Sequence, residues 1–577
     1  MIILRILFVF FGFGYIHPDA FFQSSEVVAS DVFGFDTVRT WEFEPSLPCR
    51  TIFTPAIFSG IPFLALKALS YVLPNIINPY TLLYFPRIFM FLASFVLDVV
   101  VWEFSGNDMD ALFTLGSSWV LFVLINNGFS NSIETILVAL ALKLTFRPKT
   151  SWSDFTIFGA FLAVGFFNRI TFAVYALPLV LYLLYVELKK DKKEGDWQGL
   201  VTGIMTGFFF MSLFIILIDS IYFGSIRISI AGKPFRWLDL LCPSFYTQLL
   251  TSLSTVQLTA FSWTMTPINN LQYNMKAENL AEHGTHLRIT HLLWNLPMLF
   301  GPLAVLGLGP YYFWLDEKLG EMMGQPPGAS GFTKKRFIYA KSKPPKAEKT
   351  ESKKKDAPEK KRKVLHEGRF NTGKLAILGV ILSPLVILSF AHHQEMRFLY
   401  AILVPLVILG YKTIWGSEGN VYTKGGWIAF NLVLLILLGV HHQGGLVPTI
   451  LKVASNPTEG ATTHVVFYQT YMPPRHLFAI EKDAAKPKFA VYDLKGAEGT
   501  ELKKVLLRIT ENYSYSALDK IYVVSPAAVS LDSLGQLPLV RQQSCHLSGE
   551  HWPENLGDWL NLKLNVYEWT PQKKVQE

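Results

Sequence analysis

The stretch His17-Pro18-Asp19 places an imidazole and a carboxylate directly after an apolar N-terminal run, Ile2 to Ile16. Membrane insertion of such a run requires only apolar side chains, and ionisable groups at a membrane boundary usually carry a function. Asp19 is therefore a candidate functional residue. The alternative is that Asp19 caps the next helix, because aspartate is favoured at helix N-termini.

Polar and ionisable residues gather in three places. The first cluster continues from Asp19 through Gln23, Glu26 and Glu42. The second and third follow later in the chain, at Thr266–Asn274 with Asn279–His286, and at His393-Gln394-Glu395-Met396-Arg397-Phe398. Such residues at the ends of membrane spans often satisfy backbone groups or lie in interfacial water. Whether they act together depends on which elements position them.

Composition indicates a membrane protein. Of the 577 residues, 51% are hydrophobic and 17% are charged, whereas soluble proteins carry about 25% charged residues. Apolar runs near the length that crosses ~30 Å of hydrocarbon recur along residues 1–450. Besides the first run, we predict spans at Thr51–Leu73, Tyr80–Trp102, Asp110–Ile125, Ser132–Phe146, Phe155–Glu187, Leu200–Tyr222, Ile289–Phe313, Lys374–Ala391, Phe398–Ile414 and Trp427–Val440.

The first run has two interpretations. Its length also suits a cleaved signal peptide. No small-residue cleavage site precedes His17, and many spans follow. We therefore expect a retained signal anchor.

The net charge of +8 comes from one segment. Between Lys334 and Lys363 there are fourteen Lys/Arg and four Asp/Glu, a local balance of +10 that leaves −2 for the rest. Such a segment cannot bury enough apolar surface to fold, so we predict a disordered loop at 314–373. In isolation the run fits nuclear localisation or nucleic-acid binding. Between membrane spans it fits a cytosolic loop obeying the positive-inside rule, and no nucleic-acid partner is expected.

This loop predicts the orientation of the other segments. The span after it must leave the cytosol, so His393–Arg397 and the tail after Gly444 are expected in the lumen, with the loops 17–50 and 223–288. The sequon Asn512-Tyr513-Ser514 needs the same location. To place the loop 17–50 on the luminal side, Phe155–Glu187 must cross the membrane as one unit, broken at Asn168-Arg169 where polar residues line a cavity. Two short spans are the alternative.

The tail, residues 451–577, is predicted to form a small luminal α/β domain. Short β-branched or aromatic runs predict strands at His464–Tyr468, Phe489–Tyr492, Ile521–Val524 and Leu562–Tyr567. Apolar residues at helical spacing predict a helix at Thr500–Asn512.

Several kinds of chemistry lack their usual signatures. The three cysteines Cys49, Cys242 and Cys545 provide neither a disulfide framework nor metal-site spacing. No phosphate-binding glycine loop or dinucleotide fingerprint is present. We expect no cofactor and no metal.

The three clusters converge on one membrane face, and their residues resemble a known family. His17-Pro18-Asp19-Ala20-Phe21-Phe22-Gln23 and His393–Phe398 are similar to two motifs of the dolichol-phosphate-mannose-dependent mannosyltransferases of the glycosyltransferase C superfamily. Within that family, Asn279–His286 and Gln469–Leu477 resemble the enzymes that add the fourth mannose to a glycosylphosphatidylinositol (GPI) precursor. The family usually has glutamate where this chain has Ala20.

The resemblance implies a polytopic α-helical fold, an endoplasmic reticulum membrane location and a luminal catalytic face. It implies mannose transfer from dolichol-phosphate mannose in α-1,2 linkage to a GPI precursor, with inversion at the anomeric carbon. Such a displacement needs one base, and the motif places Asp19 in that role. Arg397 and His393 are candidates for the donor phosphate, since arginine contacts phosphate bidentately; Arg397 as a snorkelling boundary residue is the alternative. Candidate substrate-binding residues are His17, Gln23, Glu26, Glu42, Asn269, Asn274, His283 and Glu395.

Three rival functions remain at this stage. The enzyme adding the third mannose shares the first and last motifs. A secondary transporter would show internal repeats and polar sites near the midplane of the membrane, whereas these clusters lie at span ends. A non-catalytic receptor or chaperone would use the tail domain, with Ala20 marking lost activity.

Overall fold

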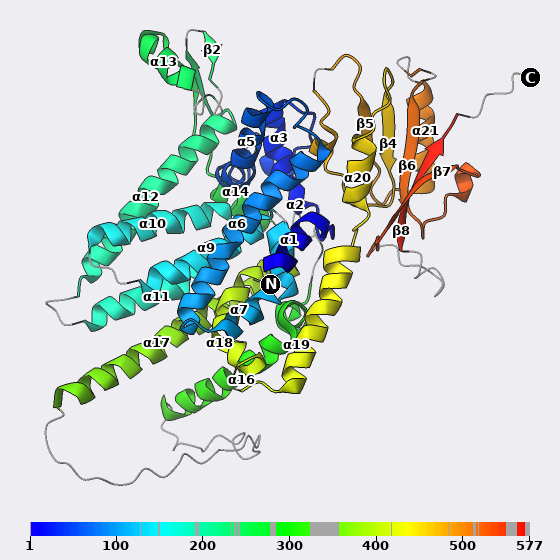
Figure 1. The fold of residues 1–577 in the computed structure, drawn as a ribbon. Helices are drawn as coiled ribbons and strands as arrows, with labels where there is room; N and C mark the ends of the chain where they lie inside the picture. The colour runs from blue at the N-terminus through cyan, green and yellow to red at the C-terminus, as the bar shows by residue number, and fades with distance from the viewer. Residues whose placement is uncertain are drawn as a thin grey trace, which may run out of the picture.

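The computed structural model describes residues 2–126, 128–147, 151–190, 195–230, 232–235, 239, 243–276, 284, 286–322, 357–416, 418–482, 484–511, 515–516, 518–549 and 562–571. A bundle of helices carries a smaller α/β domain at one end (Figure 1). This is the predicted fold class, and it is confirmed.

The first part of the bundle contains α1 (Ile2–Phe11), α2 (Asp19–Phe22), α3 (Ser25–Phe33), η1 (Trp41–Phe43), α4 (Phe53–Pro55), η2 (Ala56–Gly60), α5 (Ile61–Ser70), α6 (Pro79–Ser105), α7 (Met109–Gly116), α8 (Trp119–Asn126), α9 (Ser130–Phe146), α10 (Trp152–Asn168), α11 (Phe172–Lys189) and α12 (Trp197–Tyr222). The second part contains α13 (Pro243–Thr251), α14 (Thr266–Met275), η5 (His291–Asn295), α16 (Leu296–Met322), α17 (Ala357–Ile387), η6 (Leu388–Phe390), η7 (Met396–Ile402), α18 (Leu403–Ile414), α19 (Val421–Leu434) and η8 (Leu435–His441). Strands β1 (Ile226–Ile230), β2 (Lys233–Pro234) and β3 (Gln257–Phe261) form a small sheet beside α13, in the order β2-β1-β3.

Many of these helices are long and apolar enough to cross a membrane. Within the described residues there are eight, some combining adjacent elements: Phe53–Ser70, Pro79–Ser105, Phe172–Lys189, Trp197–Tyr222, His291–Tyr312, Thr372–Phe390, Met396–Ile414 and Val421–His441. The chain is a multi-pass membrane protein, as predicted.

Local sequence explains where the long helices begin. Asn78 precedes α6 and Asn420 precedes α19; each side chain accepts two backbone N–H groups of the first turn. In both helices a threonine three residues later completes a reciprocal capping box. Such caps satisfy donors that a helix start leaves without an intrahelical partner.

Close packing of α10 against α12 depends on glycine. A Cβ atom at Gly207 would lie 1.8 Å from the carbonyl oxygen of Thr156, and one at Gly159 would lie 2.1 Å from that of Ile204. No larger residue fits at either position without separating the helices. This contact fixes α10 and therefore the polar residues at its C-terminal end.

The segment predicted as one unit at Phe155–Glu187 is two helices, α10 and α11. Near the start of α10, the Trp152 indole N–H donates to Thr202 of α12 at 3.4 Å. Near its end, the Phe166 and Phe208 rings lie 5.9 Å apart. Because α10 and α12 therefore run in the same direction, α11, which connects them along the chain, must cross the bundle in the opposite direction. The structure supports the two-span alternative, while the polar break at Asn168-Arg169 does line a cavity.

The segment predicted as a span at Thr51–Leu73 also differs from expectation. It forms α4, η2 and α5, but both of its ends lie at the same end of the bundle. Thr51 donates to Asp219 near the end of α12 at 2.8 Å. Lys67, near the end of α5, donates to the Val32 carbonyl oxygen in α3. The helix therefore runs along the first loop and does not cross.

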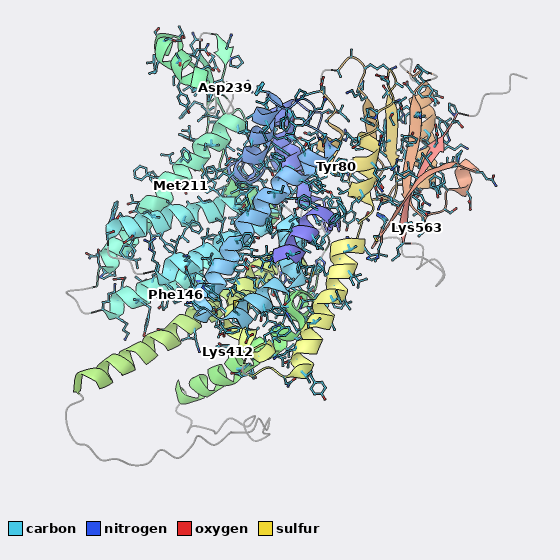
Figure 2. The ribbon with its side chains drawn as sticks, viewed as in Figure 1. Tyr80, Phe146, Met211, Asp239, Lys412 and Lys563 are labelled. Atoms are coloured by element: carbon cyan, nitrogen blue, oxygen red, sulfur yellow. The ribbon has the colours of Figure 1, made fainter. Side chains whose placement is uncertain are left out.

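These two differences cancel in the number of membrane crossings. Phe155–Glu187 crosses twice where one crossing was predicted, and Thr51–Leu73 does not cross. Tyr80 and Asp239 lie at the upper end of the bundle in Figure 2, and Phe146 and Lys412 lie toward the other end. The first loop and the tail domain share the upper end, because the Asp36 backbone N–H donates to the Ile480 carbonyl oxygen at 2.7 Å. Their placement on one side, which the sequence predicted, is unchanged.

The tail domain begins with α20 (Leu446–Ala454), slightly before the predicted boundary at 451. Its sheet has the order β5-β4-β6-β8-β7, from β4 (Thr463–Phe467), β5 (Phe489–Asp493), β6 (Lys520–Pro526), β7 (Leu539–Ser544) and β8 (Lys563–Trp569). Strand β4 is parallel to β5 and β6, whereas β8 is antiparallel to β6 and β7. The four predicted strands and the predicted helix, α21 (Gly499–Glu511), are confirmed; β7 was not predicted.

The two faces of this sheet pack differently. Val466 and Val523 face α21 and form a small core with it. Val465, Phe467 and Val524 point the other way, as alternation along a strand requires. There they join α20 and the helices of the first loop in one core. The tail domain and the first loop therefore share a hydrophobic core.

Two predictions concern residues only partly described. The loop predicted at 314–373 is helical at both ends, since α16 extends to Met322 and α17 begins at Ala357; residues 323–356 lie outside the described residues. The predicted glycosylation site at Asn512 also lies outside them.

Candidate active site

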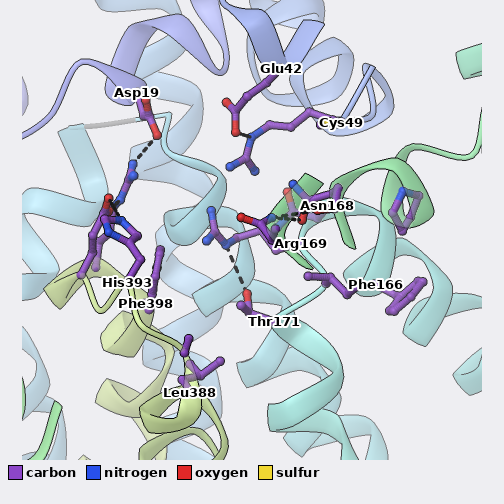
Figure 3. Close-up of a pocket in the computed structure, with 18 of the residues that line it drawn as sticks. Asp19, Glu42, Cys49, Phe166, Asn168, Arg169, Thr171, Leu388, His393 and Phe398 are labelled. Carbon is purple, nitrogen blue, oxygen red and sulfur yellow. Dashed lines mark hydrogen bonds and ion pairs between the residues drawn. The ribbon is translucent and has the colours of Figure 1, made fainter. Parts of the chain in front are cut away.

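A cavity of about 640 Å³ opens at the end of the bundle that carries the first loop (Figure 3). Its wall is formed by α2, the segment from η1 to Arg50, the break between α10 and α11, α14, and the turn between η6 and η7. The three polar clusters of the sequence therefore meet in one place. The cavity residues expected from the sequence are His17, Asp19, Glu42, Asn274, His393, Glu395 and Arg397.

Asp19 does not cap a helix. It is the first residue of α2, the N-cap position belongs to Pro18, and no side chain caps this helix. The Asp19 carboxylate instead forms an ion pair with Arg397 and accepts a hydrogen bond from the Gln23 amide. His17 Nδ1 lies 3.4 Å from the same carboxylate. The capping alternative is therefore wrong.

The surroundings of Asp19 hold it ionised. Burial by itself would raise the pKa of this carboxyl, but the Arg397 guanidinium and then His17 lower it, and the net pKa lies well below the ordinary aspartate range. Asp19 is therefore present as a carboxylate, the form that a general base needs, across the neutral pH range. Its low pKa also makes it a weak base, so precise placement must supply much of its effect.

Glu395 and His393 complete the other side of Arg397. Glu395 accepts from Arg397 Nε and from His393 Nε2, the latter at 2.7 Å. Burial raises the pKa of Glu395, but Arg397 and His393 outweigh it and hold that pKa below the usual range. The hydrogen bond to Glu395 raises the pKa of His393, whose Nδ1 lies 3.1 Å from the Gly284 carbonyl oxygen. Because both ring nitrogens face acceptors, this arrangement favours the protonated form of His393.

Gln23 links Asp19 to the rest of the cavity wall. Its amide nitrogen donates to Asp19 and, at 2.9 Å, to Glu42. Its amide oxygen accepts from the Ser130 hydroxyl at 2.8 Å. Gln23 is 3% exposed, so it positions Asp19 and Glu42 from behind and does not line the cavity.

Two arginines of the cavity were not predicted as site residues. Arg50 donates to Glu42 at 2.7 Å and to Ser130 at 3.2 Å. Arg169, in the break between α10 and α11, donates to the same Ser130 hydroxyl at 2.9 Å. The interruption of an apolar run by Asn168-Arg169 was a signal for the second arginine. Arg50 lies in a polar loop, where an arginine gives no such signal.

The remaining predicted residues lie elsewhere. Glu26 is completely buried against His476 and does not face the cavity, so a sugar-binding role does not fit it. Asn269 does not line the cavity either; it donates to the Pro48 carbonyl oxygen at 2.9 Å. Asn274 is exposed at the rim, where Trp41 stacks on Tyr273 with ring centroids 4.1 Å apart. His283 lies outside the described residues.

Ala20 bears on the difference from the family motif. Its side chain is 3% exposed and is absent from the cavity lining, because it packs in the core shared with the tail domain. The position after Asp19 therefore points away from the cavity. A missing carboxyl there does not remove an acid from the cavity wall.

A second cavity of about 320 Å³ lies next to the first. It shares His17, Glu395 and Arg397 with the first cavity and is otherwise lined largely by the first span's end, η5 and η7. These three residues therefore form a polar wall between two cavities. Among the described residues, no group of three or more His, Cys, Asp or Glu side chains is placed to hold a metal ion.

Residues 1–479 match the family model of the Alg9-like mannosyltransferases. The chain belongs to the Alg9-like mannosyltransferase family. The match includes the whole helical bundle and continues into the tail domain as far as η9 (Arg475–Phe478). Family membership makes this chain a membrane-embedded mannosyltransferase.

Two named relatives support the family assignment. GPI alpha-1,2-mannosyltransferase 4 of Homo sapiens is 31% identical over 89% of this chain and 81% of its own length. GPI mannosyltransferase 4 of Debaryomyces hansenii is 28% identical over 96% of this chain and 94% of its own. Among solved structures, ArnT from Cupriavidus metallidurans bound to undecaprenyl phosphate aligns with a TM-score of 0.45 and 11% identity, covering 99% of this chain and 98% of its own.

Proposed function

We propose that this Alg9-like mannosyltransferase adds the fourth mannose to a GPI precursor. The donor is dolichol-phosphate mannose, and the new bond is an α-1,2 linkage to the third mannose. Two kinds of support exist: the sequence motifs, and relatives named GPI mannosyltransferase 4 that are 26–31% identical over most of the chain. The reaction is placed on the luminal face of the endoplasmic reticulum membrane.

The observation that carries the mechanism is the ionised Asp19 on the cavity wall, held between Arg397 and Gln23. Conversion of a β-linked donor into an α-linked product requires inversion, and a single displacement achieves it. The acceptor hydroxyl attacks the anomeric carbon while the bond from that carbon to the phosphate oxygen breaks. Asp19 takes the hydroxyl proton, and dolichyl phosphate departs with the bonding electrons.

A weak base suits this reaction. Glycosyl transfer passes through an oxocarbenium-like transition state. The attacking hydroxyl becomes acidic only as its bond to carbon forms, so the proton moves late. Asp19 then needs correct orientation more than a high pKa, and its contacts with Arg397 and Gln23 provide that orientation.

The cavity offers groups for the acceptor sugars. Glu42 lies on the wall beside Asp19, and Asn274 and Trp41 lie at the rim. Carboxylates and amides bind sugar hydroxyls, and an aromatic ring packs against the apolar face of a pyranose. We assign this side of the cavity, between η1 and α14, to the acceptor glycan.

Defined acceptors test the proposal. The purified full-length protein receives dolichol-phosphate mannose with either a three-mannose or a two-mannose GPI lipid, and Asp19→Asn serves as the inactive control. We expect transfer to the three-mannose lipid only, with a product sensitive to α-1,2-mannosidase. Efficient use of the two-mannose lipid would assign the chain to the third-mannose reaction. Absence of transfer to both lipids, with an intact fold, would refute the proposal.

A further inference from the structure

Arg50 and Arg169 converge on one hydroxyl group. They come from separate elements, yet both donate to Ser130 Oγ, at 3.2 and 2.9 Å. The same hydroxyl donates its proton to Gln23. Ser130 thus bridges two guanidinium groups at the inner wall of the cavity.

Each arginine has one carboxylate partner and an unused edge. Arg50 Nε faces Glu42 at 2.7 Å, and Arg169 Nε lies 3.4 Å from Glu134. The hydrogen bonds of both residues within the described chain involve Nε and Nη1 only. The Nη2 groups are therefore available for a ligand. Both side chains line the cavity although they are largely buried, with exposed fractions of 14% and 8%.

Apolar side chains lead to this arginine pair. Phe166, Phe167 and Ile170 flank Arg169 in the chain and line the same cavity. Leu388 and Phe390 of η6 contribute further apolar surface, and Phe166 and Leu388 lie below Arg169 in Figure 3. A hydrocarbon chain with a phosphate at its end matches this combination of an apolar wall and two guanidinium groups.

Arg397 is less suited to a leaving phosphate. It is occupied by the carboxylates of Asp19 and Glu395. In an inverting displacement the attacking and leaving oxygens lie on opposite faces of the anomeric carbon, so the leaving phosphate must be separated from the base by the sugar. Arg397 touches the base itself. Arg50 and Arg169 reach Asp19 only indirectly, through Gln23, which Arg50 meets by way of Ser130 or Glu42 and Arg169 by way of Ser130.

We propose that Arg50 and Arg169, bridged by Ser130, form a subsite for a lipid-linked phosphate. The inference rests on the proposed mannosyl transfer and names the groups that stabilise its leaving group. As the bond between the anomeric carbon and oxygen breaks, negative charge develops on the phosphate, and the two Nη2 groups donate to its oxygens. The ligand chemistry has two sources: the donor lipid, or a phosphate carried by the acceptor glycolipid.

Binding of dolichyl phosphate, which has no mannose to transfer, tests the subsite directly. The probe is titrated into the full-length protein in detergent, with thermal stabilisation as the readout. Loss of one charge-assisted contact corresponds to roughly 10- to 100-fold weaker binding. We expect this for Arg50→Gln and Arg169→Gln. Arg39→Gln is the matched control, because Arg39 pairs with Asp31 outside the cavity.

Kinetics with both substrates separate the two sources. A raised KM for the donor with an unchanged acceptor KM assigns the subsite to the donor phosphate; the reverse assigns it to the acceptor. If the glutamine variants do not fold, Arg50→Lys and Arg169→Lys keep the charge but lose the bidentate edge, and the same weakening is expected. Unchanged binding of both substrates in the folded Arg50 and Arg169 variants would overturn the inference. Loss of dolichyl phosphate binding in Arg397→Gln, with normal binding in the Arg50 and Arg169 variants, would also overturn it.

The binding readout also distinguishes this inference from the proposed function. If the variants lose dolichyl phosphate while the wild-type protein fails to use the three-mannose lipid, the subsite stands and the acceptor assignment fails. If the wild-type protein transfers mannose and the variants bind dolichyl phosphate and acceptor normally, the transfer stands and the subsite is refuted.

Discussion

Glu26 and His476 are 450 positions apart in the chain, yet the Glu26 carboxylate and His476 Nδ1 lie 2.6 Å apart. Their side chains are 0% and 1% exposed. The carboxylate also accepts the backbone N–H groups of Arg475 and His476, each at 3.1 Å, and that of Val38 at 3.2 Å. One buried carboxylate thus ties α3 in the first loop to η9 in the tail domain. The loop that carries Asp19 is held in place by this contact.

Glu26→Ala is expected to destabilise the protein. Removal of the Glu26 carboxyl leaves the His476 ring and three backbone N–H groups without a partner. Each buried polar group that loses its partner typically costs about 1–3 kcal/mol. Thermal unfolding of the purified protein in detergent measures the effect, and mannose transfer should fall with the folded fraction. Glu44→Ala is the control, since Glu44 is exposed in the same loop.

The alternative for Glu26 is a role in binding the acceptor. In that case Glu26→Ala would raise the acceptor KM and leave the melting temperature unchanged. That outcome would contradict the structural role.

The sequence could not distinguish Glu26 from Glu42. Both are acidic residues of the first loop with similar neighbours, and only the fold buries one against the tail domain while the other lines the cavity. By contrast, Asp19 and Arg397 could be placed in one site from their motifs and from the expected topology. Their direct ion pair, and the presence of Arg50 beside them, depend on long-range packing that local sequence does not encode.

The fold shows the same limit. The segment that forms α4, η2 and α5 places Phe63 and Leu66, both fully buried, in the core shared with the tail domain. An apolar run does not reveal whether protein or lipid surrounds it. Strand β7 was missed for the opposite reason: Leu539–Ser544 is an edge strand with mostly exposed residues, so its sequence shows no apolar alternation.

Asp19→Asn is expected to reduce mannose transfer by about 10²–10⁴, the usual contribution of a general base. Asparagine keeps the size of the side chain but cannot accept the proton of the attacking hydroxyl. Radiolabelled transfer measures the rate, and the melting temperature reports the fold. Asp36→Asn is the matched control, because Asp36 belongs to the same loop but does not line the cavity. Near-normal activity of the Asp19 variant would remove this residue from the mechanism.

Deletion of residues 341–355 is expected to leave transfer largely intact. This part of the basic run contains many lysines and few apolar residues, a composition from which no contribution to a folded core is expected. Lys334, Lys335 and Arg336 remain and preserve the orientation signal. Transfer assays and protease mapping of orientation provide the measurement, with a Gly/Ser replacement of equal length as control. Lost activity with unchanged orientation would show that the run acts in catalysis or substrate entry.

Arg397→Gln is expected to change the pH dependence of transfer. Burial raises the pKa of Asp19, and Arg397 is the principal group that lowers it. Without that guanidinium the pKa of Asp19 should rise, because only His17 and Arg50 then oppose the effect of burial. Since the base must be ionised, activity should fall on acidification at a higher pH than in the wild-type protein. Arg397→Lys retains the charge and should retain the wild-type acid limb, although its single ammonium group orients Asp19 less well. Rate–pH profiles of the three proteins decide the question. An unchanged acid limb in Arg397→Gln would mean that ionisation of Asp19 does not limit the reaction.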